Sequence, residues 1–272
     1  YRKAASMAGE DGVKIRTFDL SLEHLSEEAA EFEPEKNPAL GLRAVRLGLT
    51  HKKQFCTQIR ALLQASAGGK NLDILLPMIS DVAEIRLVRE IIRTEKARLK
   101  KKNIKFGDPK IGAMIEVPSA VLMAEEIAAE VDFLNLGTND LVQYLLAVDR
   151  DNAAVAEWFR TLHPAVLRAV KKVIQAAAQH KIPLTICGEM AGSAVYVPLL
   201  IGLGAEELSM NVNSIPRIRR IISSIAYEEA REITSELEAC RTANEIESLV
   251  KTRFQEKWKH LFPPEIFHHA KK

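Results

Sequence analysis

Short apolar runs alternate with longer amphipathic segments along most of this 272-residue chain, and no other feature limits the possible folds so strongly. Each run is rich in aliphatic and β-branched residues and has the length of a buried strand. Runs this apolar suit strands that are covered on both faces, so the alternation predicts an α/β fold with a parallel sheet. The predicted strands are Val13–Thr17, Asp73–Pro77, Ile111–Glu116, Asp132–Leu136, Pro183–Cys187 and Glu207–Met210.

The intervening segments carry apolar residues at intervals of three and four, which is the period of a helix with one buried face. Val82, Ile85 and Val88 follow this spacing, and Asp81 before them favours a helix start. Alternating strands and helices of this kind build the (β/α)8 barrel, which has eight strands. Because six strands are predicted, we expect a TIM (β/α)8-type barrel that lacks its first two strands in this chain.

The sequence after Ile215 carries no strand signal, and the helical spacing continues instead. We therefore expect extra C-terminal helices over 215–272, whereas residues 1–12 suit the tail of a preceding helix. No internal repeat and no linker rich in Gly, Ser or Pro divides the chain, so we expect 1–272 to form a single barrel domain. The predicted C-terminal helices are Pro216–Ser224, Tyr227–Glu238 and Ala243–His260.

Charge and cysteine content argue against several classes of protein. The chain has 38 Lys and Arg against 36 Asp and Glu, a net charge of +2, whereas a protein that wraps nucleic acid usually needs a clear basic surplus. It has no run of about 18 uncharged apolar residues, so we expect no membrane insertion. Three widely spaced cysteines, Cys56, Cys187 and Cys240, suit reduced thiols in a cytoplasmic protein better than disulfides or a zinc site.

Polar side chains stand near the ends of several predicted strands. Arg16 is near the end of the first, Glu116 ends the third, Asn139-Asp140 follows the fourth and Cys187 ends the fifth. The carboxyl ends of strands in a parallel barrel meet on one face, so we expect these side chains to gather there. Carboxylates suit Mg²⁺, which takes further ligands from water and substrate phosphate, and arginine suits phosphate or carboxylate. The pattern predicts a Mg²⁺-dependent site for a small, doubly anionic substrate.

The carboxylates and the amide also have plainer interpretations. A lone Glu116 at a strand end is more often a surface or loop carboxylate. Asn139 and Asp140 could instead cap the helix that follows them, which is the commoner role of such a pair.

The cationic and thiol side chains have alternatives as well. Arg16 could belong to a structural ion pair, and Cys187 could be a small buried side chain. Arg43 and Arg46 could share a solvated helical face, and Lys96–Lys105 reads as a solvated helix end. The site is favoured because several such residues follow different strands, not because of any one of them.

Six segments of the chain match the motifs of one family in order and spacing. They are Ile15–Asp19 (IRTFD), Asn37–Arg46 (NPALGLRAVR), Met114–Ala120 (MIEVPSA), Gly137–Tyr144 (GTNDLVQY), Ala147–Arg150 (AVDR) and Cys187–Gly192 (CGEMAG). Together they resemble the C-terminal phosphoenolpyruvate (PEP)-binding barrel of enzyme I of the phosphotransferase system, the PEP–protein phosphotransferases. The resemblance runs from about Val13 to at least Ile221, and the sequence around Glu116 is more similar to the nitrogen-related branch of the family.

The resemblance implies which residues would hold the substrate. Arg16 and Arg43 would bind the phosphate of PEP, and Arg150 would also contact the anion. Asn139 would hydrogen-bond the phosphate through its side chain. Phosphoryl transfer depends mostly on positioning and charge neutralisation, so these residue types fit the implied chemistry.

The resemblance also implies a metal site and a proton donor. Glu116 and Asp140 would bind Mg²⁺, which would bridge to substrate oxygens. Cys187 would protonate the methylene carbon of the enolate once the phosphoryl group has left, so that pyruvate is released. A thiol near neutral pH can serve as such an acid.

Members of this family are transferases of the kinase type, and the resemblance implies a cytoplasmic homodimer. Their phosphate passes to a histidine on a separate N-terminal domain and then to a small histidine phosphocarrier protein. No histidine of this chain has the Gly/Ser/His-rich context of that residue, so we expect the phosphohistidine domain to be absent and the reaction to be incomplete in this chain alone. The family's glycine pair after Asp19 is replaced here by Leu20-Ser21-Leu22-Glu23.

Two other functions stay open at this point. The chain could be the barrel of a pyruvate phosphate dikinase or PEP synthase, which share the fold. It could also be a non-catalytic dimerisation or regulatory module that keeps the motifs as a scaffold. Mg²⁺-dependent binding of PEP would separate a working site from a scaffold.

Overall fold

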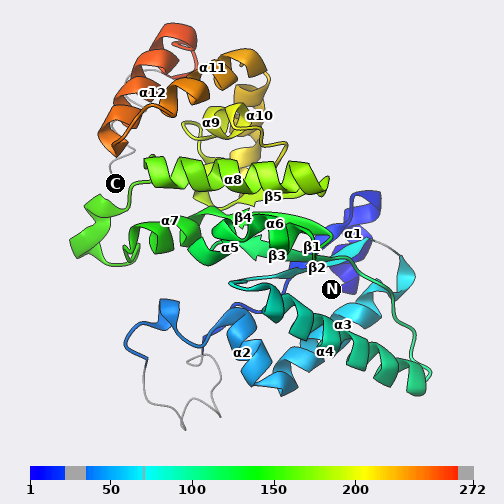
Figure 1. Cartoon of the computed structure of the whole chain (residues 1–272). Coiled ribbons are helices and arrows are strands. Elements are labelled where there is room, and N and C mark those ends of the chain that lie inside the picture. The colour runs from blue at the N-terminus through cyan, green and yellow to red at the C-terminus, as the bar shows by residue number, and fades with distance from the viewer. Residues whose placement is uncertain (22–34, 70, 263–272) are drawn as a thin grey trace. The chain divides into compact units, whose positions relative to one another are not determined.

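The computed structural model describes residues 1–21, 35–69 and 71–262 (Figure 1). Leu22 and Glu23 of the altered loop lie outside the described residues, as does the end of the predicted C-terminal segment. The chain divides into two compact units. The first unit is Tyr1–Ile115 with Glu125–Leu134, and the second is Glu116–Ala124 with Asn135–Lys272.

All six predicted strands are present in the described part of the chain, with ends that shift by no more than two residues. They are β1 (Val13–Arg16), β2 (Leu72–Leu76), β3 (Ile111–Ile115), β4 (Phe133–Gly137), β5 (Leu184–Cys187) and β6 (Glu207–Leu208). The pairs β1–β2, β2–β3 and β5–β6 are parallel. The residues of β3 and β4 are all buried, as expected for strands covered on both faces.

Neighbouring strands follow the order of the chain. The order is β1-β2-β3-β4 in the first unit and β4-β5-β6 in the second, and β4 has residues in both. A doubly wound sheet reverses its strand order at a switch point, whereas a (β/α)8 barrel adds each strand beside the previous one. The sequential order and the intervening helices confirm the predicted class, an α/β fold of the (β/α)8 type.

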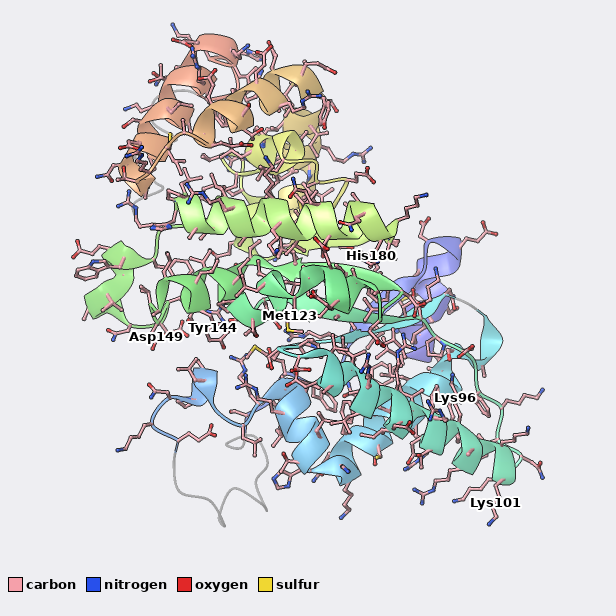
Figure 2. The ribbon with its side chains drawn as sticks, in the orientation of Figure 1. Lys96, Lys101, Met123, Tyr144, Asp149 and His180 are labelled. Atoms are coloured by element: carbon pink, nitrogen blue, oxygen red, sulfur yellow. The ribbon has the colours of Figure 1, made fainter. Side chains whose placement is uncertain are left out.

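In the first unit, helix α3 (Lys52–Ala65) packs against β2 and against helix α4 (Val82–Lys101). The helix start predicted at Asp81 is confirmed, and it takes the form of a capping box: the Asp81 carboxylate accepts from the Ala83 N–H at 2.6 Å, and Glu84 accepts from the Asp81 N–H at 3.1 Å. At its other end α4 carries exposed lysines such as Lys101, as expected for a solvated helix end (Figure 2). Further helices of this unit are α1 (Arg2–Ala8), α2 (Ala44–Thr50) and α6 (Ala124–Ala128). The first residue of α6, Ala124, belongs to the second unit.

The second unit has a hydrophobic cluster of its own. Helix α11 packs against α9 and α12, and α10 packs against α9. Phe254 lies between Trp258 and Phe262, with ring centroids 5.0 and 4.6 Å away, and the Trp258 indole donates to Glu229 at 2.8 Å. The helices of this unit are α5 (Pro118–Leu122), α7 (Thr138–Leu146), α8 (Pro164–His180), α9 (Val197–Gly202), α10 (Ile215–Ile222), α11 (Tyr227–Leu237) and α12 (Ala243–Lys257).

Short 3₁₀ turns connect many of these elements: η1 (Gly9–Asp11), η4 (Pro38–Leu40), η5 (Ser66–Gly68), η6 (Ala153–Trp158), η7 (Glu189–Gly192) and η8 (Val212–Ser214). The three cysteines are free thiols, as predicted. Within the described ranges, none of the helices combines the length and the apolar character needed to cross a bilayer.

Candidate functional site

The candidate residues fall into two groups, one in each unit. Arg16 ends β1 and Arg43 precedes α2, both in the first unit. In the second unit, Asn139 after β4 contacts the loop at the end of β5, and Arg150 forms an ion pair with Asp140. The candidates of the second unit are Glu116, Asn139, Asp140, Arg150 and Cys187.

In the first unit, both candidate arginines bind the carboxylate of Asp19. Arg43 makes two contacts, from Nε to Oδ1 at 3.0 Å and from Nη2 to Oδ2 at 2.9 Å, and Arg16 Nη1 lies 3.2 Å from Oδ2. The Asp19 side chain is 6% exposed and that of Arg43 is 15% exposed, whereas that of Arg16 is 48% exposed. Asp19 therefore holds a half-buried arginine in a bidentate ion pair and a more exposed arginine by one contact.

Backbone contacts bring these residues together across 24 positions of sequence. The Thr17 N–H extends the strand pairing to the Leu75 carbonyl at 2.9 Å. Ser21 forms an antiparallel bridge with Arg43, and the next residue, Ala44, donates its N–H to the Leu20 carbonyl at 3.0 Å. These backbone hydrogen bonds hold the segment before α2 next to the loop that follows β1.

One expectation about this cluster is wrong. Arg43 does not share a helical face with Arg46, because α2 begins at Ala44 and Arg43 has extended backbone angles, φ −134° and ψ 167°. Arg43 points to Asp19, while Arg46 donates to the Leu40 carbonyl at 3.3 Å. The predicted structural ion pair of Arg16 is present, and its partner, Asp19, lies in the IRTFD motif without having been assigned a role.

Glu116 follows β3 directly and is 2% exposed. Glu116 is therefore not a surface carboxylate, whereas the other half of that alternative, a loop carboxylate with a partner, stays open. A carboxylate is rarely buried this far without compensation by a hydrogen bond or an opposite charge, and Glu116 does have a hydrogen-bonding or electrostatic interaction within the chain.

Asp140 lies in the first turn of α7 and forms an ion pair with Arg150, whose Nη1 is 3.0 Å from Asp140 Oδ1. The Asp140 side chain is 9% exposed and that of Arg150 is 37% exposed. The geometry is not that of a hydrogen bond, and among the described residues no donor satisfies this buried oxygen. Arg150 therefore neutralises the carboxylate without saturating it, which leaves an oxygen lone pair for another cation.

Gln143 fixes the loop that carries Arg150. Its side-chain oxygen accepts from the Arg150 N–H at 3.1 Å, and its carbonyl accepts from the Val148 N–H at 3.0 Å. Ala147 ends the helix in the left-handed region, with φ +53°, so the chain reverses just after α7. Tyr144 and Asp149 mark this helix end and loop in Figure 2. Gln143 is buried and belongs to the GTNDLVQY motif, yet no role was predicted for it.

The end of β5 is joined to the start of α7. The Thr138 hydroxyl donates to the Cys187 carbonyl at 2.8 Å, and Asn139 Oδ1 accepts from the Glu189 N–H at 2.8 Å. The Cys187 thiol lies 3.4 Å from the Leu136 carbonyl in β4. Asn139 and Cys187, predicted to converge from different strands, therefore do lie together.

Asn139 and Asp140 do not cap α7, so that alternative is wrong. The helix begins at Thr138, its N-cap is Gly137, and the N-cap has no side-chain hydrogen bond. The pair occupies the first turn instead, and its side chains contact the Glu189 backbone and Arg150. A first-turn carboxylate is still favoured there by the helix dipole.

The donor set fits a hard divalent cation. Glu116 and Asp140 are buried carboxylates of the second unit, and oxygen ligands of this kind suit Mg²⁺. In the described ranges, no group of three or more His, Cys, Asp or Glu side chains is arranged to hold a metal. Two carboxylates suffice for Mg²⁺ when substrate and water oxygens complete its coordination.

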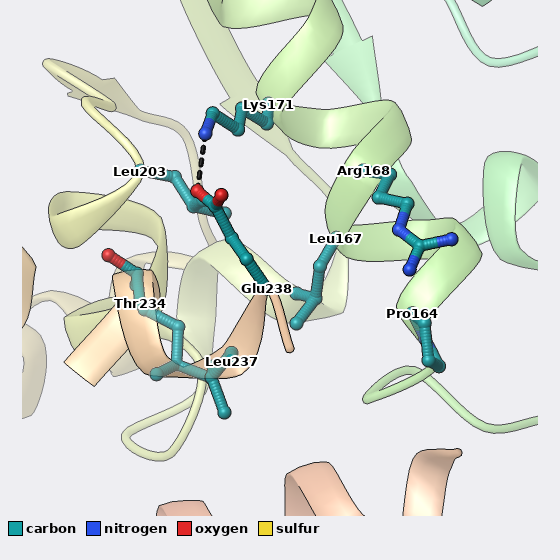
Figure 3. Close-up of a pocket in the computed structure, with 9 residues that line it drawn as sticks. Pro164, Leu167, Arg168, Lys171, Leu203, Thr234, Leu237 and Glu238 are labelled. Carbon is teal, nitrogen blue, oxygen red and sulfur yellow. Dashed lines mark hydrogen bonds and ion pairs between the residues drawn. The ribbon is translucent and has the colours of Figure 1, made fainter. Parts of the chain in front are cut away.

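A small cavity of the second unit is separate from these residues (Figure 3). It measures about 30 Å³, is lined largely by apolar side chains such as Leu167 and Leu237, and carries the ion pair of Lys171 with Glu238 at its edge. That volume holds one or two waters and no larger ligand. None of the predicted site residues lines it, so we assign it no role in the site.

Most of the chain matches a known family. A family model described as "PEP-utilising enzyme, PEP-binding domain" matches residues 1–227. The chain belongs to this family.

Relatives from several bacteria support the assignment. A phosphoenolpyruvate-protein phosphotransferase of Listeria monocytogenes is 42% identical over 254 residues, which cover 91% of this chain and 43% of that protein. One of Geobacillus stearothermophilus is 39% identical over 93% of this chain and 44% of its own length. A protein of Escherichia coli called phosphoenolpyruvate-dependent phosphotransferase system is 39% identical over 90% and 33%. The chain spans less than half the length of these relatives.

Proposed function

We propose that this chain supplies the PEP-binding site of a PEP–protein phosphotransferase. The observation that carries the proposal is the joining of Thr138 and Asn139, which follow β4 and directly precede Asp140, with the Cys187 loop at the end of β5. This brings an amide, a carboxylate and a thiol into one small region, as a reaction on a phosphorylated enol requires. The family assignment supports the same substrate.

The cationic residues bind the anion in this proposal. Arg43 and Arg16 hold the phosphate, and their shared contact with Asp19 keeps both guanidinium groups in place before the substrate arrives. Arg150 also contacts the anion, and Asn139 donates a hydrogen bond from its amide nitrogen, because its oxygen is already engaged by the Glu189 N–H. Guanidinium groups are well matched to phosphate and carboxylate oxygens.

Glu116 and Asp140 hold Mg²⁺ in this proposal. When bound, the ion neutralises charge on the substrate oxygens during phosphoryl transfer. Asp140 would bind the ion with the oxygen that now pairs with Arg150, and Arg150 would then contact the anion. Cys187 gives its thiol proton to the methylene carbon of the enolate, which becomes the methyl group of pyruvate.

The remaining steps belong to a longer protein. The phosphoryl group passes to a histidine of another part of that protein and on to a histidine phosphocarrier protein, and the whole works as a cytoplasmic homodimer. The names of the relatives and the smaller share that this chain covers of them support this division of labour. We do not favour a dikinase or synthase barrel, because the relatives reported above are phosphotransferase-system proteins.

Calorimetric titration of PEP into the chain, with and without Mg²⁺, tests the proposal. We expect saturable binding that needs Mg²⁺ in the wild type. Glu116→Gln and Asp140→Asn should each weaken it at least about tenfold, because each removes one of two protein ligands of the metal. Asp108→Asn is the matched control, since Asp108 is an exposed carboxylate paired with Lys96 and should leave binding unchanged.

Circular dichroism would show whether each variant is folded. Wild-type affinity in both Glu116→Gln and Asp140→Asn would contradict the metal assignment. Absence of PEP binding in a folded wild-type chain would contradict the larger proposal and favour a scaffold.

A further inference from the structure

Two adjacent side chains of α7 hold the two peptide groups on either side of Gly188. Thr138 donates to the carbonyl of Cys187, which precedes this glycine, and Asn139 accepts from the N–H of Glu189, which follows it. The donor and acceptor of the loop are thus both satisfied from one helical turn, 49 and 50 positions away in sequence. Such paired contacts fix the path of the loop backbone rather than a single side chain.

Gly188 has a backbone conformation that suits this arrangement and few other residues. Its φ is +96° and its ψ is −174°, in a region that is essentially restricted to glycine. A Cβ added there would lie 2.4 Å from Thr138 Oγ1 and 2.8 Å from Asn139 Oδ1. The absence of a side chain at Gly188 therefore lets the Thr138 hydroxyl reach the loop.

Thr138 does not use its hydroxyl in the ordinary local way. A threonine at a helix start commonly bonds the backbone of its own helix, whereas Thr138 is 1% exposed and its hydroxyl reaches the Cys187 carbonyl. The Cys187 thiol meanwhile lies against the Leu136 carbonyl at 3.4 Å. The main chain and the thiol of Cys187 therefore both contact the segment from Leu136 to Thr138, which leads directly into Asn139 and Asp140.

We propose that Thr138 is a positioning residue that aims the Cys187 thiol for proton transfer, a proposal that rests on the function proposed above for Cys187. In that step the S–H bond of Cys187 breaks and a C–H bond forms at the methylene carbon, while the enolate oxygen returns to a carbonyl. The sulfur is left as a thiolate and takes a proton from water. Without the Thr138 hydroxyl, the Cys187 backbone loses its anchor and the thiol its fixed direction.

The reverse step gives an assay that needs only this chain. A thiolate that removes a proton from the methyl group of bound pyruvate exchanges it for deuterium in D₂O, and NMR measures the rate in the presence of Mg²⁺. We expect Thr138→Val to slow this exchange at least about tenfold, because a misplacement of about 1 Å can cost a hundredfold in rate. PEP affinity should change less than about threefold, since Thr138 is not a ligand. Thr138→Ser, which keeps the hydroxyl, should restore most of the rate.

Thr234→Val is the matched control. Thr234 is also buried and donates its hydroxyl to a backbone carbonyl, that of Arg231 at 3.0 Å, but in α11. It should exchange pyruvate at the wild-type rate. If Thr234→Val slowed pyruvate exchange as much as Thr138→Val, the effect would reflect a general loosening of the fold, and the proposal would be overturned.

The cysteines provide a second readout that is independent of turnover. Mass spectrometry follows alkylation of Cys187, Cys56 and Cys240 by iodoacetamide in the same sample. Thr138→Val should change the rate at Cys187 several-fold while buried Cys240 stays protected, which also shows that the variant is folded. If Cys240 reacts freely, Thr138→Ala takes the place of the valine variant. An unchanged Cys187 rate in the folded variant would overturn the positioning role.

Failure of this proposal differs from failure of the proposed function. Wild-type exchange in Thr138→Val, together with lost exchange in Cys187→Ala, would overturn the role of Thr138 and leave the proton donor in place. Wild-type exchange in Cys187→Ala would overturn the function of Cys187 on which the proposal rests.

Discussion

The two clusters of candidate residues are held together by different forces. In the first unit, Asp19 gathers Arg16 and Arg43 through charge, with three contacts of 2.9 to 3.2 Å to one carboxylate. In the second, Thr138 and Asn139 hold a loop through its backbone, and Gly188 makes room for them. The first cluster depends on which charges are present, and the second depends on backbone shape.

This difference determines how each cluster tolerates change. A charge cluster with a solvated member can lose one contact and rearrange, because water and salt compensate exposed charges. The loop at Gly188 is held by side chains of α7 that hydrogen-bond to its main chain, so it cannot shift without leaving the buried Thr138 hydroxyl unpaired. We therefore expect the largest losses from the loop and smaller ones from the charges.

Gly188→Ala should have the largest effect. The substitution forces an L-residue into a conformation that costs about 1–3 kcal/mol, and its Cβ also collides with the Thr138 hydroxyl. We expect a loss of that order or more in the free energy of unfolding, measured with urea, and loss of Mg²⁺-dependent PEP binding.

Gly192→Ala is the control from the same segment. A Cβ at Gly192 would meet the Ser214 hydroxyl at 3.4 Å, an ordinary contact, and the backbone there needs no positive φ. Its unfolding free energy should stay within about 0.5 kcal/mol of wild type. If both alanine variants behaved alike, backbone shape would not be what distinguishes the second cluster.

Arg43→Ala and Arg16→Ala should separate stability from binding in the first cluster. Removing Arg43 deletes two hydrogen bonds to a nearly buried carboxylate, and we expect a loss of about 1–3 kcal/mol in the free energy of unfolding. Arg16 is half exposed, so its removal should cost no more than about 1 kcal/mol. Both variants should weaken PEP binding by calorimetry. If both variants lost the same free energy of unfolding, burial would not determine how much each ion pair contributes to stability.

Arg150→Met should reveal the charge balance at Asp140. Without Arg150 the carboxylate loses its internal cation, so the affinity for Mg²⁺ alone should rise up to about fivefold, the value of a partly exposed ion pair. PEP affinity should fall, because the anion loses a positive charge. Arg160→Met, which breaks the comparable pair of Arg160 with Glu247, should alter neither affinity. A drop in Mg²⁺ affinity in Arg150→Met would contradict the exchange of partners proposed at Asp140.

The strands and the polar residues near their ends could be predicted from the sequence, because the spacing of apolar and polar residues is a local property. The sequence did not predict the partners of these residues, since Arg43 meets Asp19 across 24 positions and Thr138 meets Cys187 across 49. Side-chain contacts between loops leave no periodic signal. The motifs contained both Asp19 and Thr138, but nothing in their spacing identified what they bind.

Two of the wrong expectations in the site share one cause, the exact residue at which a helix begins. Helix α7 begins at Thr138, so the Asn139–Asp140 pair moves from the cap into the first turn. Helix α2 begins at Ala44, whose φ is +52°, and this leaves Arg43 outside the helix and directed at Asp19. A shift of one or two residues therefore changes the role of a side chain at a helix start.

The start of α8 offers the smallest test and a contrast within the same unit. His163 caps that helix locally, because its Nδ1 accepts from the Ala165 N–H at 3.1 Å, whereas the side chains that open α7 reach a distant loop. Burial lowers the pKa of His163, and the neighbouring Arg160 and Arg168 lower it further. The neutral ring is the form that can accept this hydrogen bond.

The sign of the pH dependence follows from that lowered pKa. The unfolded chain binds the proton more readily than the folded chain, so the contribution of His163 to stability is present above about pH 6.5 and is lost as the pH falls through the folded value. His163→Asn keeps a capping oxygen that does not titrate, and should reduce the fall in stability between pH 7.5 and 5 by no more than the worth of a cap, about 1 kcal/mol. PEP binding at pH 7.5 should not change, because this cap serves only its own helix. A weakened PEP site in His163→Asn would mean that α8 and the loop of Gly188 are coupled, and that the second cluster extends further than its hydrogen bonds.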